Sequence, residues 1–173
     1  VRTIVHSDQG DLAFQHYFVR EGCGPKVSGF SFDGIANAKL NPLIREWLAD
    51  CDGVIICPSN PFVSVDPLLH LDGFGEALKS LPVIAVSPIV GGIAIKGPAA
   101  KMMHELNMPA TSLAVADHYQ GLIDGFVVDQ TDAALVEQFN VPTISTPSVM
   151  VTLQDRIDLA RTCVSFLASL SSN

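Results

Sequence analysis

Short apolar runs rich in β-branched residues alternate with helical patterns through most of the chain. The runs are GVIICPS (53–59), PVIAVSP (82–88), DGFVVD (124–129) and VPTISTP (141–147). Short, continuously hydrophobic runs that are separated by helices are typical of parallel strands buried on both faces. The sequence therefore predicts an α/β fold, Rossmann-like, with three layers (α/β/α) and a mostly parallel sheet.

Helical patterns lie between and around these strands. They cover 36–51, 72–81, 98–107, 111–121, 131–140 and 152–170. Asn41 and Thr111 are residue types that cap helices, and Pro42 suits a first turn. The last helix has an apolar stripe formed by Leu153, Ile157, Ala160, Val164 and Leu167.

The first 35 residues are less regular, with a short helix expected within 11–22 and an exposed strand over 26–34. The whole length of 173 residues supports one sizeable core rather than two. We therefore expect residues 1–173 to form a single α/β domain.

Charge and composition exclude several partners. The net charge of -8 argues against nucleic acid, because a phosphate backbone is bound by clustered Lys and Arg. No apolar run reaches the roughly 20 residues of a membrane span.

The four cysteines match no metal-ligand spacing, and Cys57 and Cys163 lie on apolar patterns, so we expect them to be buried and reduced. Reduced thiols indicate a cytoplasmic protein.

Ligands of open α/β sheets bind outside the carboxyl ends of the strands, which selects the segments 58–67, 87–98 and 129–132. In the first segment, Ser59, Asn60 and Ser64 offer short polar groups where the chain leaves the sheet. A plain Asx or Ser turn would use the same residue types, so a ligand contact and a local turn both remain open.

The second segment, SPIVGGIAIKGP, has the features of a phosphate-binding loop. Gly91 and Gly92 allow a close backbone approach, Lys96 supplies positive charge, and Gly97 precedes a helix in which Lys101 adds a second charge. The segment matches neither GxGxxG nor GxxxxGK[ST], so it supports neither a dinucleotide site nor a P-loop. An ordinary Gly-Gly turn with a solvated lysine is the alternative.

The third segment is acidic. Asp129 suits a metal ligand, whereas Asp132 reads equally well as an acid in the first turn of a helix. His118 lies on a helical pattern, where a packing role is the better interpretation. The sequence contains no GxSxG elbow and no HExxH pair, so a serine hydrolase or zinc protease is not indicated.

Longer segments resemble a known family. CPSNPFVSVDPLL (57–69), PVIAVSPIVGGIAIKGPAAKMM (82–103) and LAVADHYQGLIDGFVVDQTDAA (113–134) are similar to the 2-phospho-L-lactate transferases of the CofD family, as is the opening VRTIVHSDQGDLAFQHYFVRE. That family moves a 2-phospholactyl group, or a related phosphoenolpyruvyl-type group, from a guanosine diphosphate diester to the deazaflavin alcohol Fo. The transfer releases GMP in coenzyme F420 biosynthesis and is assisted by Mg²⁺.

The resemblance also implies site residues and a missing part. Donor contacts would come from Ser59, Asn60, Pro61 and Ser64, and the phosphates would be surrounded by Ser87, Gly91, Gly92, Lys96 and Gly97. Family members carry a glycine-rich strand–loop–helix and acidic metal ligands before this region. We therefore expect the chain to be the C-terminal part of a longer CofD-like enzyme, with its Mg²⁺ ligands in the absent N-terminal part.

Two other functions remain open at this point. The related YvcK-type regulators share the sheet architecture and bind a nucleotide or nucleotide-sugar without catalysis. An assembly subunit is the other, because the 152–170 helix offers an apolar face. A homodimer also remains open.

Overall fold

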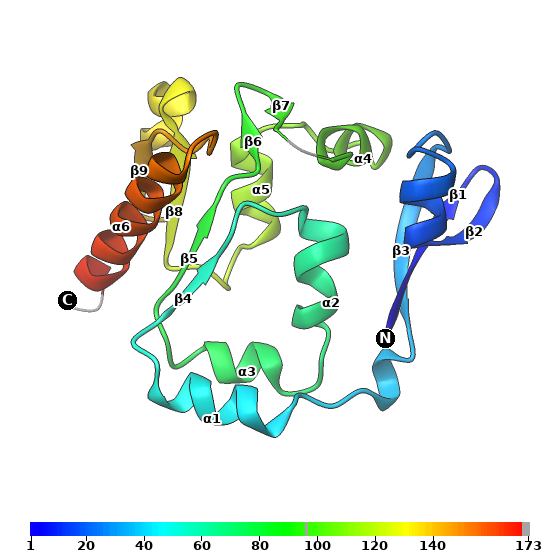
Figure 1. Cartoon of the computed structure of the whole chain (residues 1–173), viewed down its shortest axis with the longest axis horizontal. Coiled ribbons are helices and arrows are strands. Elements are labelled where there is room, and N and C mark those ends of the chain that lie inside the picture. Colours follow the sequence, from blue (N-terminus) through cyan, green and yellow to red (C-terminus); the bar gives the residue numbers. More distant parts are fainter. Residues whose placement is uncertain (96, 171–173) are drawn as a thin grey trace.

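The computed structural model describes residues 1–95 and 97–170, and its centre is a parallel four-stranded sheet. The strands are β4 (Val54–Ile56), β5 (Val83–Val86), β8 (Gly125–Asp129) and β9 (Thr143–Thr146), in the spatial order β4-β5-β8-β9. Each strand falls inside one of the apolar runs, so the predicted α/β class and parallel sheet are confirmed. The carboxyl ends of all four strands lie along one edge (Figure 1).

The sheet is buried on both faces, which gives the three predicted layers. Alternate residues of β5 and β8 point to opposite sides, as the period of a strand requires. One side, which includes Val83 and Phe126, packs in the larger hydrophobic cluster. The other side, which includes Ile84 and Val127, packs against Leu159 of the last helix.

That last helix, α6 (Leu153–Leu170), covers one face of the sheet (Figure 1). Its buried residues are Leu159, Cys163 and Leu167, whereas Leu153 is 71% exposed and Val164 is 58% exposed. The predicted stripe is therefore wrong at Leu153 and Val164 and confirmed at Leu167, and the helix and the burial of Cys163 are also confirmed. The stripe through Val164 and the stripe through Cys163 both have helical spacing, and the second is the one that packs against the sheet.

Shorter helices cover the opposite face. They are η3 (Pro61–Val65), α2 (Asp66–Leu69), α3 (Phe74–Leu78), α4 (Ala99–Glu105) and α5 (Ser112–His118). The expected cap at Thr111 is confirmed, because its side chain accepts a hydrogen bond from the backbone N–H of Ala114. Asn41 likewise accepts from Leu43 at the start of α1 (Pro42–Asp50).

Two small elements complete this half of the molecule. A hairpin of β6 (Ile89–Val90) and β7 (Ile93–Ala94) follows β5. The segment expected as a helix over 131–140 is a 3₁₀ helix, η4 (Gln130–Gln138). Side-chain hydrogen bonds of Asp129 and Asp132 fix its first turn against neighbouring loops.

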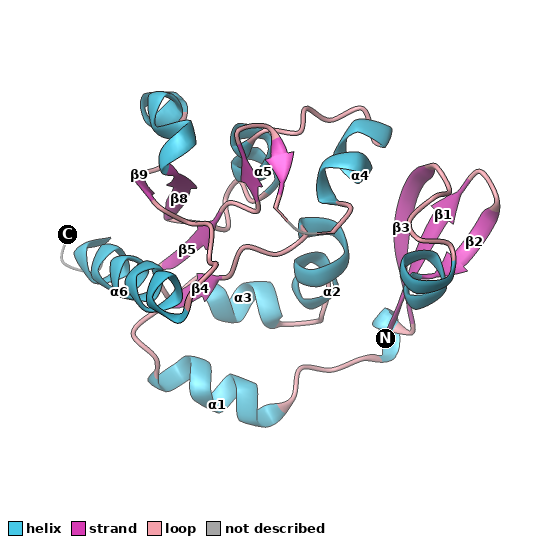
Figure 2. Cartoon of the chain, turned by 45° about the horizontal axis from the view of Figure 1, so that its top comes forward, coloured by secondary structure: helices cyan, strands magenta, loops and turns pink. Residues whose placement is uncertain are grey.

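The first forty residues form a separate antiparallel sheet (Figure 2). It contains β1 (Arg2–Ser7), β2 (Gly10–Ala13) and β3 (Val27–Asp33) in the order β2-β1-β3, with η1 (His16–Arg20) and η2 (Ile35–Asn37) at its connections. The strand expected over 26–34 is confirmed, and the helix expected within 11–22 is reduced to the π-helical η1. The β1–β2 hairpin was not expected, although its Ser7–Gly10 turn is closed by a local hydrogen bond of 2.7 Å.

Helix α4 joins this sheet to the rest of the chain. The Lys101 ammonium donates to the Pro25 carbonyl at 2.9 Å and pairs with the Glu105 carboxylate at 2.6 Å, and Glu105 also accepts from the N–H of Val27. Among the described residues, no helix is long and apolar enough to cross a membrane.

Two glycines let α6 approach the sheet closely. A Cβ on Gly125, at the start of β8, would lie 2.8 Å from Phe166 Cε1 and 2.9 Å from Leu170 Cδ1. A Cβ on Gly53, before β4, would lie 2.8 Å from both Leu167 Cδ2 and the Pro82 carbonyl oxygen. The close contact between helix and sheet therefore depends on the missing side chains at these positions.

We predict that Gly53→Ala lowers the free energy of unfolding by about 1–3 kcal/mol, because the added methyl would meet the backbone carbonyl oxygen of Pro82 as well as Leu167 of α6. Gly75→Ala is the matched control, since a Cβ there meets nothing within 4 Å. That change lies inside α3 and should stabilise the protein by roughly 0.5–1 kcal/mol. Urea denaturation measures both, and equal effects of the two changes would contradict this account of the packing.

Candidate functional site

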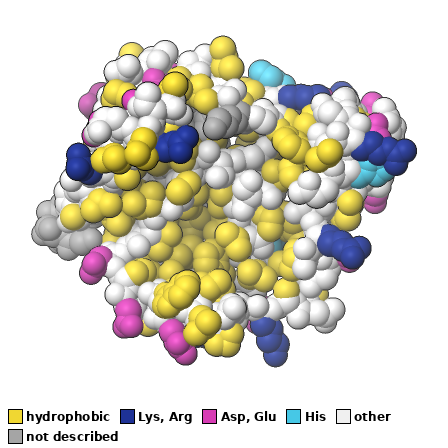
Figure 3. All heavy atoms as spheres, viewed as in Figure 1, with side chains coloured by type: hydrophobic (Ala, Val, Ile, Leu, Met, Phe, Trp, Pro, Cys, Tyr) yellow, Lys and Arg dark blue, Asp and Glu magenta, His cyan; other side chains and the backbone are white. Residues whose placement is uncertain are grey.

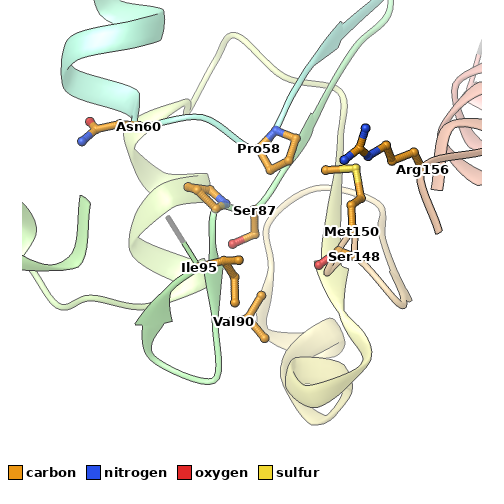
Figure 4. A pocket seen from close by; sticks show the side chains of 9 residues that line it. Pro58, Asn60, Ser87, Val90, Ile95, Ser148, Met150 and Arg156 are labelled. Atoms are coloured by element: carbon orange, nitrogen blue, oxygen red, sulfur yellow. The ribbon is translucent and has the colours of Figure 1, made fainter. Parts of the chain in front are cut away.

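A cleft of about 360 Å³ opens at the carboxyl edge of the parallel sheet. Segments that follow β4, β5 and β9 supply its lining, as do the β6–β7 hairpin and the first turn of α6 (Figure 4). The lining residues are Pro58, Asn60, Ser87, Pro88, Val90, Ile95, Ser148, Met150 and Arg156. The cleft therefore lies where an open α/β sheet usually binds its ligand.

Ser87 lies in the middle of this cleft, directly after β5 (Figure 4). Its side chain is almost fully buried, and its hydroxyl donates to the Ile89 carbonyl at 2.8 Å and accepts from the Ile89 N–H at 3.1 Å. These bonds close the turn between β5 and β6. They use the hydroxyl proton and one of its two lone pairs within the protein.

Ser148 faces the cleft from the loop after β9, and Asp129 holds it there. Both the backbone N–H and the hydroxyl of Ser148 donate to Asp129 Oδ2, at 2.8 and 3.0 Å. The other oxygen of Asp129 accepts from the N–H and the hydroxyl of Thr131, at 2.9 and 2.7 Å. Asp129 thus ties the end of β8 to two loops at the carboxyl edge.

These bonds also determine the charge of Asp129, which is 3% exposed. Burial alone would raise its pKa, but the hydrogen bonds from Thr131 and Ser148 outweigh burial and hold the pKa below the ordinary value of 3.8. Asp129 is therefore a buried carboxylate whose oxygens are already bonded within the protein.

Arg156 places a positive charge at the cleft from the first turn of α6 (Figure 4). Its guanidinium has no ion pair with any residue that the structure describes. Positive charge in a first turn opposes the helix dipole, so the stability of α6 does not explain an arginine there. A free guanidinium beside a polar cleft is suited to binding phosphate or carboxylate.

The glycine hairpin tip lies beside the cleft rather than in it. Gly91 and Gly92 have φ values of 56° and 79°, which favour glycine. The N–H of Gly91 donates to both carboxylate oxygens of Asp132, at 3.2 and 3.1 Å. The Gly91 amide, expected to face a phosphate, is thus bonded within the protein, and the Asp132 carboxylate beside it disfavours an anion.

The other residues predicted for this loop are not found together at the cleft. Gly97 is exposed before α4, and Lys96 lies outside the described residues. Lys101 does not add charge to this loop as expected, because it pairs with Glu105 and is directed to the N-terminal sheet.

The predicted turn after β4 is also divided between two places. Asn60 caps η3, since its Oδ1 accepts from the Phe62 N–H at 3.0 Å, and its amide is directed away from Ser87 in Figure 4. Pro61 is buried. Ser59 and Ser64 line a different, mostly apolar groove beside β4. Of the predicted residues that the structure describes, the cleft brings together only Asn60 and Ser87.

The three segments predicted to bind a ligand follow three of the four strands. They therefore do not include Ser148, Met150 and Arg156. The fourth run, 141–147, forms β9, and the strand-end rule would have selected the segment after it. Cys57 was also wrongly expected to be buried. It is exposed because β4 already ends at Ile56.

Acidic and histidine side chains do not form a metal site in the part of the chain that the structure describes. No group of three or more His, Cys, Asp or Glu side chains lies within reach of one ion there. The residues present therefore do not fit the Mg²⁺ that the resemblance implies.

His118 is part of the packing, as expected, where its Nε2 lies 2.8 Å from Asp66 Oδ1 and its ring contacts Phe62 and Tyr119.

Two of the solved structures with a similar fold are of the same protein. Protein BH3568 of Bacillus halodurans superposes with a TM-score of 0.60 at 16% identity, over 94% of this chain and 58% of that one. A second structure of the protein, described as a member of the upf0052 family, gives a TM-score of 0.57. At this identity the likeness concerns the fold alone, and it agrees with the Rossmann-like architecture.

The chain is also similar in sequence to curated transferases of other organisms. The 2-phospho-L-lactate transferase of Methanococcoides burtonii is 36% identical over 98% of this chain and 56% of its own length. That of Halobacterium salinarum is 34% identical over 99% of this chain and 49% of its own length. The chain thus spans about half the length of the curated relatives that it matches. The family described as 2-phospho-L-lactate transferase CofD matches residues 1–155, and the chain belongs to this family.

Proposed function

We propose that this chain supplies part of the active site of a 2-phospho-L-lactate transferase in coenzyme F420 biosynthesis. The observation that carries the proposal is the cleft at the carboxyl edge of the sheet, where Arg156 places a positive charge beside polar groups. The match of residues 1–155 to the CofD family supports the same reaction. No feature of the cleft favours the nucleotide-sugar regulator over the transferase.

The reaction would transfer a 2-phospholactyl group from a guanosine diphosphate diester to Fo. The primary alcohol oxygen of Fo forms a bond to the phosphorus that carries lactate, and the bond from that phosphorus to the bridging oxygen breaks. GMP leaves with the electron pair of the broken bond, and the proton of the alcohol passes to the leaving phosphate or to water. Positioned cations and donors stabilise the charge that spreads over the phosphoryl oxygens.

In this scheme Arg156 binds the diphosphate of the donor at the mouth of the cleft. A guanidinium offers a rigid fork of donors that matches two phosphate oxygens. Lys96 would add a second cation from the loop after the hairpin, as the sequence indicates. Ligands for the Mg²⁺ that the family resemblance implies would come from the part of the family's chain that this sequence does not contain.

Asp129 would be a positioning residue in the same site. Its carboxylate fixes Ser148 at the cleft and Thr131 at the start of η4. Each carboxylate oxygen already accepts two hydrogen bonds within the protein, so Asp129 does not contact the substrate in this scheme. Loss of the carboxylate would therefore loosen two loops at once without removing a substrate contact.

We predict that Arg156→Ala lowers kcat/KM by about 10- to 100-fold in a protein of full family length. The lost contacts are hydrogen bonds to a charged group, which contribute about 1.5–3 kcal/mol. GMP release with the guanosine donor, Fo and Mg²⁺ measures the rate. Arg161→Ala is the control on the same helix, because that side chain is 75% exposed and pairs with the exposed Asp158.

Equal kinetics of the two arginine variants would remove Arg156 from the donor site. Absence of GMP release from the unsubstituted protein, combined with tight binding of a nucleotide-sugar in calorimetry, would contradict the transferase itself.

We predict that Asp129→Asn lowers the free energy of unfolding by about 2 kcal/mol near neutral pH, because an amide nitrogen would face hydrogen-bond donors. The folded-state pKa of Asp129 lies below 3.8, so its contribution is complete above that value and is lost as the pH falls through the folded pKa. Urea denaturation at about pH 7 and about pH 3 should show the difference from wild type shrink. A difference that stays constant between these pH values would contradict the assignment.

A further inference from the structure

The first turn of η4 is bonded to two opposite walls of the cleft. The β6–β7 hairpin forms one wall, here called the hairpin wall, and the loop that contains Ser148 forms the other, the Ser148 wall (Figure 4). Asp129, at the start of η4, accepts two hydrogen bonds from Ser148. Asp132, in the same turn, accepts the N–H of Gly91 at the tip of the hairpin. One short segment of the chain therefore connects the two walls.

The hairpin depends on this bond for its placement. Each of its strands, β6 and β7, has two residues, and a hairpin is at best marginally stable without further support. Its base is held because the Ser87 hydroxyl forms two hydrogen bonds with the backbone of Ile89. Near the tip, Ile93 is 67% exposed, so burial contributes little there. The tip is held instead by its hydrogen bond to Asp132.

The contact between the tip and η4 is close. Asp132 is 8% exposed, and its two carboxylate oxygens lie 3.1 and 3.2 Å from the Gly91 nitrogen. A Cβ on Gly91 would lie 3.3 Å from Thr131 Cγ2, which is tighter than an ordinary van der Waals contact. The tip therefore packs directly on the first turn of η4, and its position follows that of Asp132.

The negative charge of Asp132 does not explain this arrangement. The proposed function places an anionic donor in the cleft, and a nearby carboxylate repels an anion. An amide oxygen in the same position would accept the Gly91 N–H without that repulsion. The feature that the hairpin uses is therefore an acceptor oxygen in a fixed place.

The placement of the walls matters because the protein attracts an anion only weakly as a whole. The net charge is -8, and Figure 3 shows the Lys and Arg side chains of the described residues scattered over the face in view. Such a distribution does not steer an anion to one place by its general field. Binding then depends on a few groups in the cleft, and a misplacement of about 1 Å can cost up to about 100-fold in rate.

We propose that Asp132 is a positioning residue of the transfer site, which holds the hairpin wall opposite the Ser148 wall by accepting the Gly91 N–H. This role rests on the proposed function, and it requires the acceptor oxygen rather than the negative charge. Asp129 and Asp132 together fix the separation of the two walls from one turn of η4. The hairpin wall is thereby ordered before the donor arrives, so donor binding does not have to order it.

Amide hydrogen exchange at Gly91 tests the anchor in a CofD protein of full family length that contains this chain. Asp132→Ala removes the acceptor, whereas Asp132→Asn keeps an oxygen for the Gly91 N–H. Without nucleotide, the Gly91 amide should exchange at least about tenfold faster in Asp132→Ala and at nearly the wild-type rate in Asp132→Asn. Unchanged exchange at Gly91 in a folded Asp132→Ala variant would overturn the proposal.

Asp124→Ala is the matched control, because Asp124 makes the same kind of bond at the other end of β5. Its Oδ2 accepts the N–H of Val83 at 2.8 Å. This variant should speed exchange at Val83 and leave both the Gly91 amide and the affinity for GDP unchanged. Equal acceleration at Gly91 in Asp124→Ala and Asp132→Ala would show general loosening of the fold and would overturn the proposal.

The affinity for GDP, measured by calorimetry, separates the acceptor from the charge. Asp132→Ala should weaken GDP binding by about 3- to 10-fold, as expected for one hydrogen bond. Asp132→Asn should bind GDP at least as tightly as the wild type, because it removes a negative charge from beside the cleft. The kcat/KM for GMP release should follow the same order. Equal losses in both variants would assign the role to the charge and overturn the proposal.

A second pair of variants decides if Asp132→Ala does not fold. Asp132→Glu keeps the charge but displaces the acceptor by one methylene, so it should bind GDP more weakly than Asp132→Asn. The reverse order would overturn the proposal. If the unsubstituted protein binds no GDP, the proposed function fails, and the exchange rate of Gly91 still decides whether Asp132 anchors the hairpin wall.

Discussion

The parallel strands of the central sheet have to be covered on both faces, and the rest of the structure follows from that requirement. Helix α6 covers one face, and it can approach closely because Gly53 and Gly125 present no side chains to it. The shorter helices cover the other face. Because the strands are parallel, each connection between them leads the chain back to the end of the sheet where strands begin. The carboxyl ends of β4, β5, β8 and β9 are thereby collected along one edge, and the cleft forms there.

The sequence alone predicted most of the central sheet, because apolar runs such as PVIAVSP carry a strong local signal. The caps at Asn41 and Thr111 were predictable for the same reason. The buried face of α6 was not, since the residues through Val164 and those through Cys163 both have helical spacing. The β1–β2 hairpin was missed because its register depends on pairing with β3, which is distant along the chain.

The candidate site was only partly predictable. The strand-end rule and the family resemblance indicated Ser87 and Asn60, but spacing does not show which polar groups are already bonded within the protein. The Gly91 N–H donates to the Asp132 carboxylate, and the Asn60 amide donates to the Met102 sulfur. Both groups are therefore bonded within the protein. Arg156 is remote in sequence from the glycine loop, and only folding brings it to the cleft.

The central claim is that the carboxyl-edge cleft holds the diphosphate of a guanosine donor, with Arg156 as a cation that binds it. A crystal structure of a full-length CofD protein that contains this chain, in complex with GDP, tests the claim most directly. The account predicts phosphate oxygens within hydrogen-bond distance of the Arg156 guanidinium, between the loops after β5 and β9. Phosphates bound elsewhere, with Arg156 still in solvent, would contradict it.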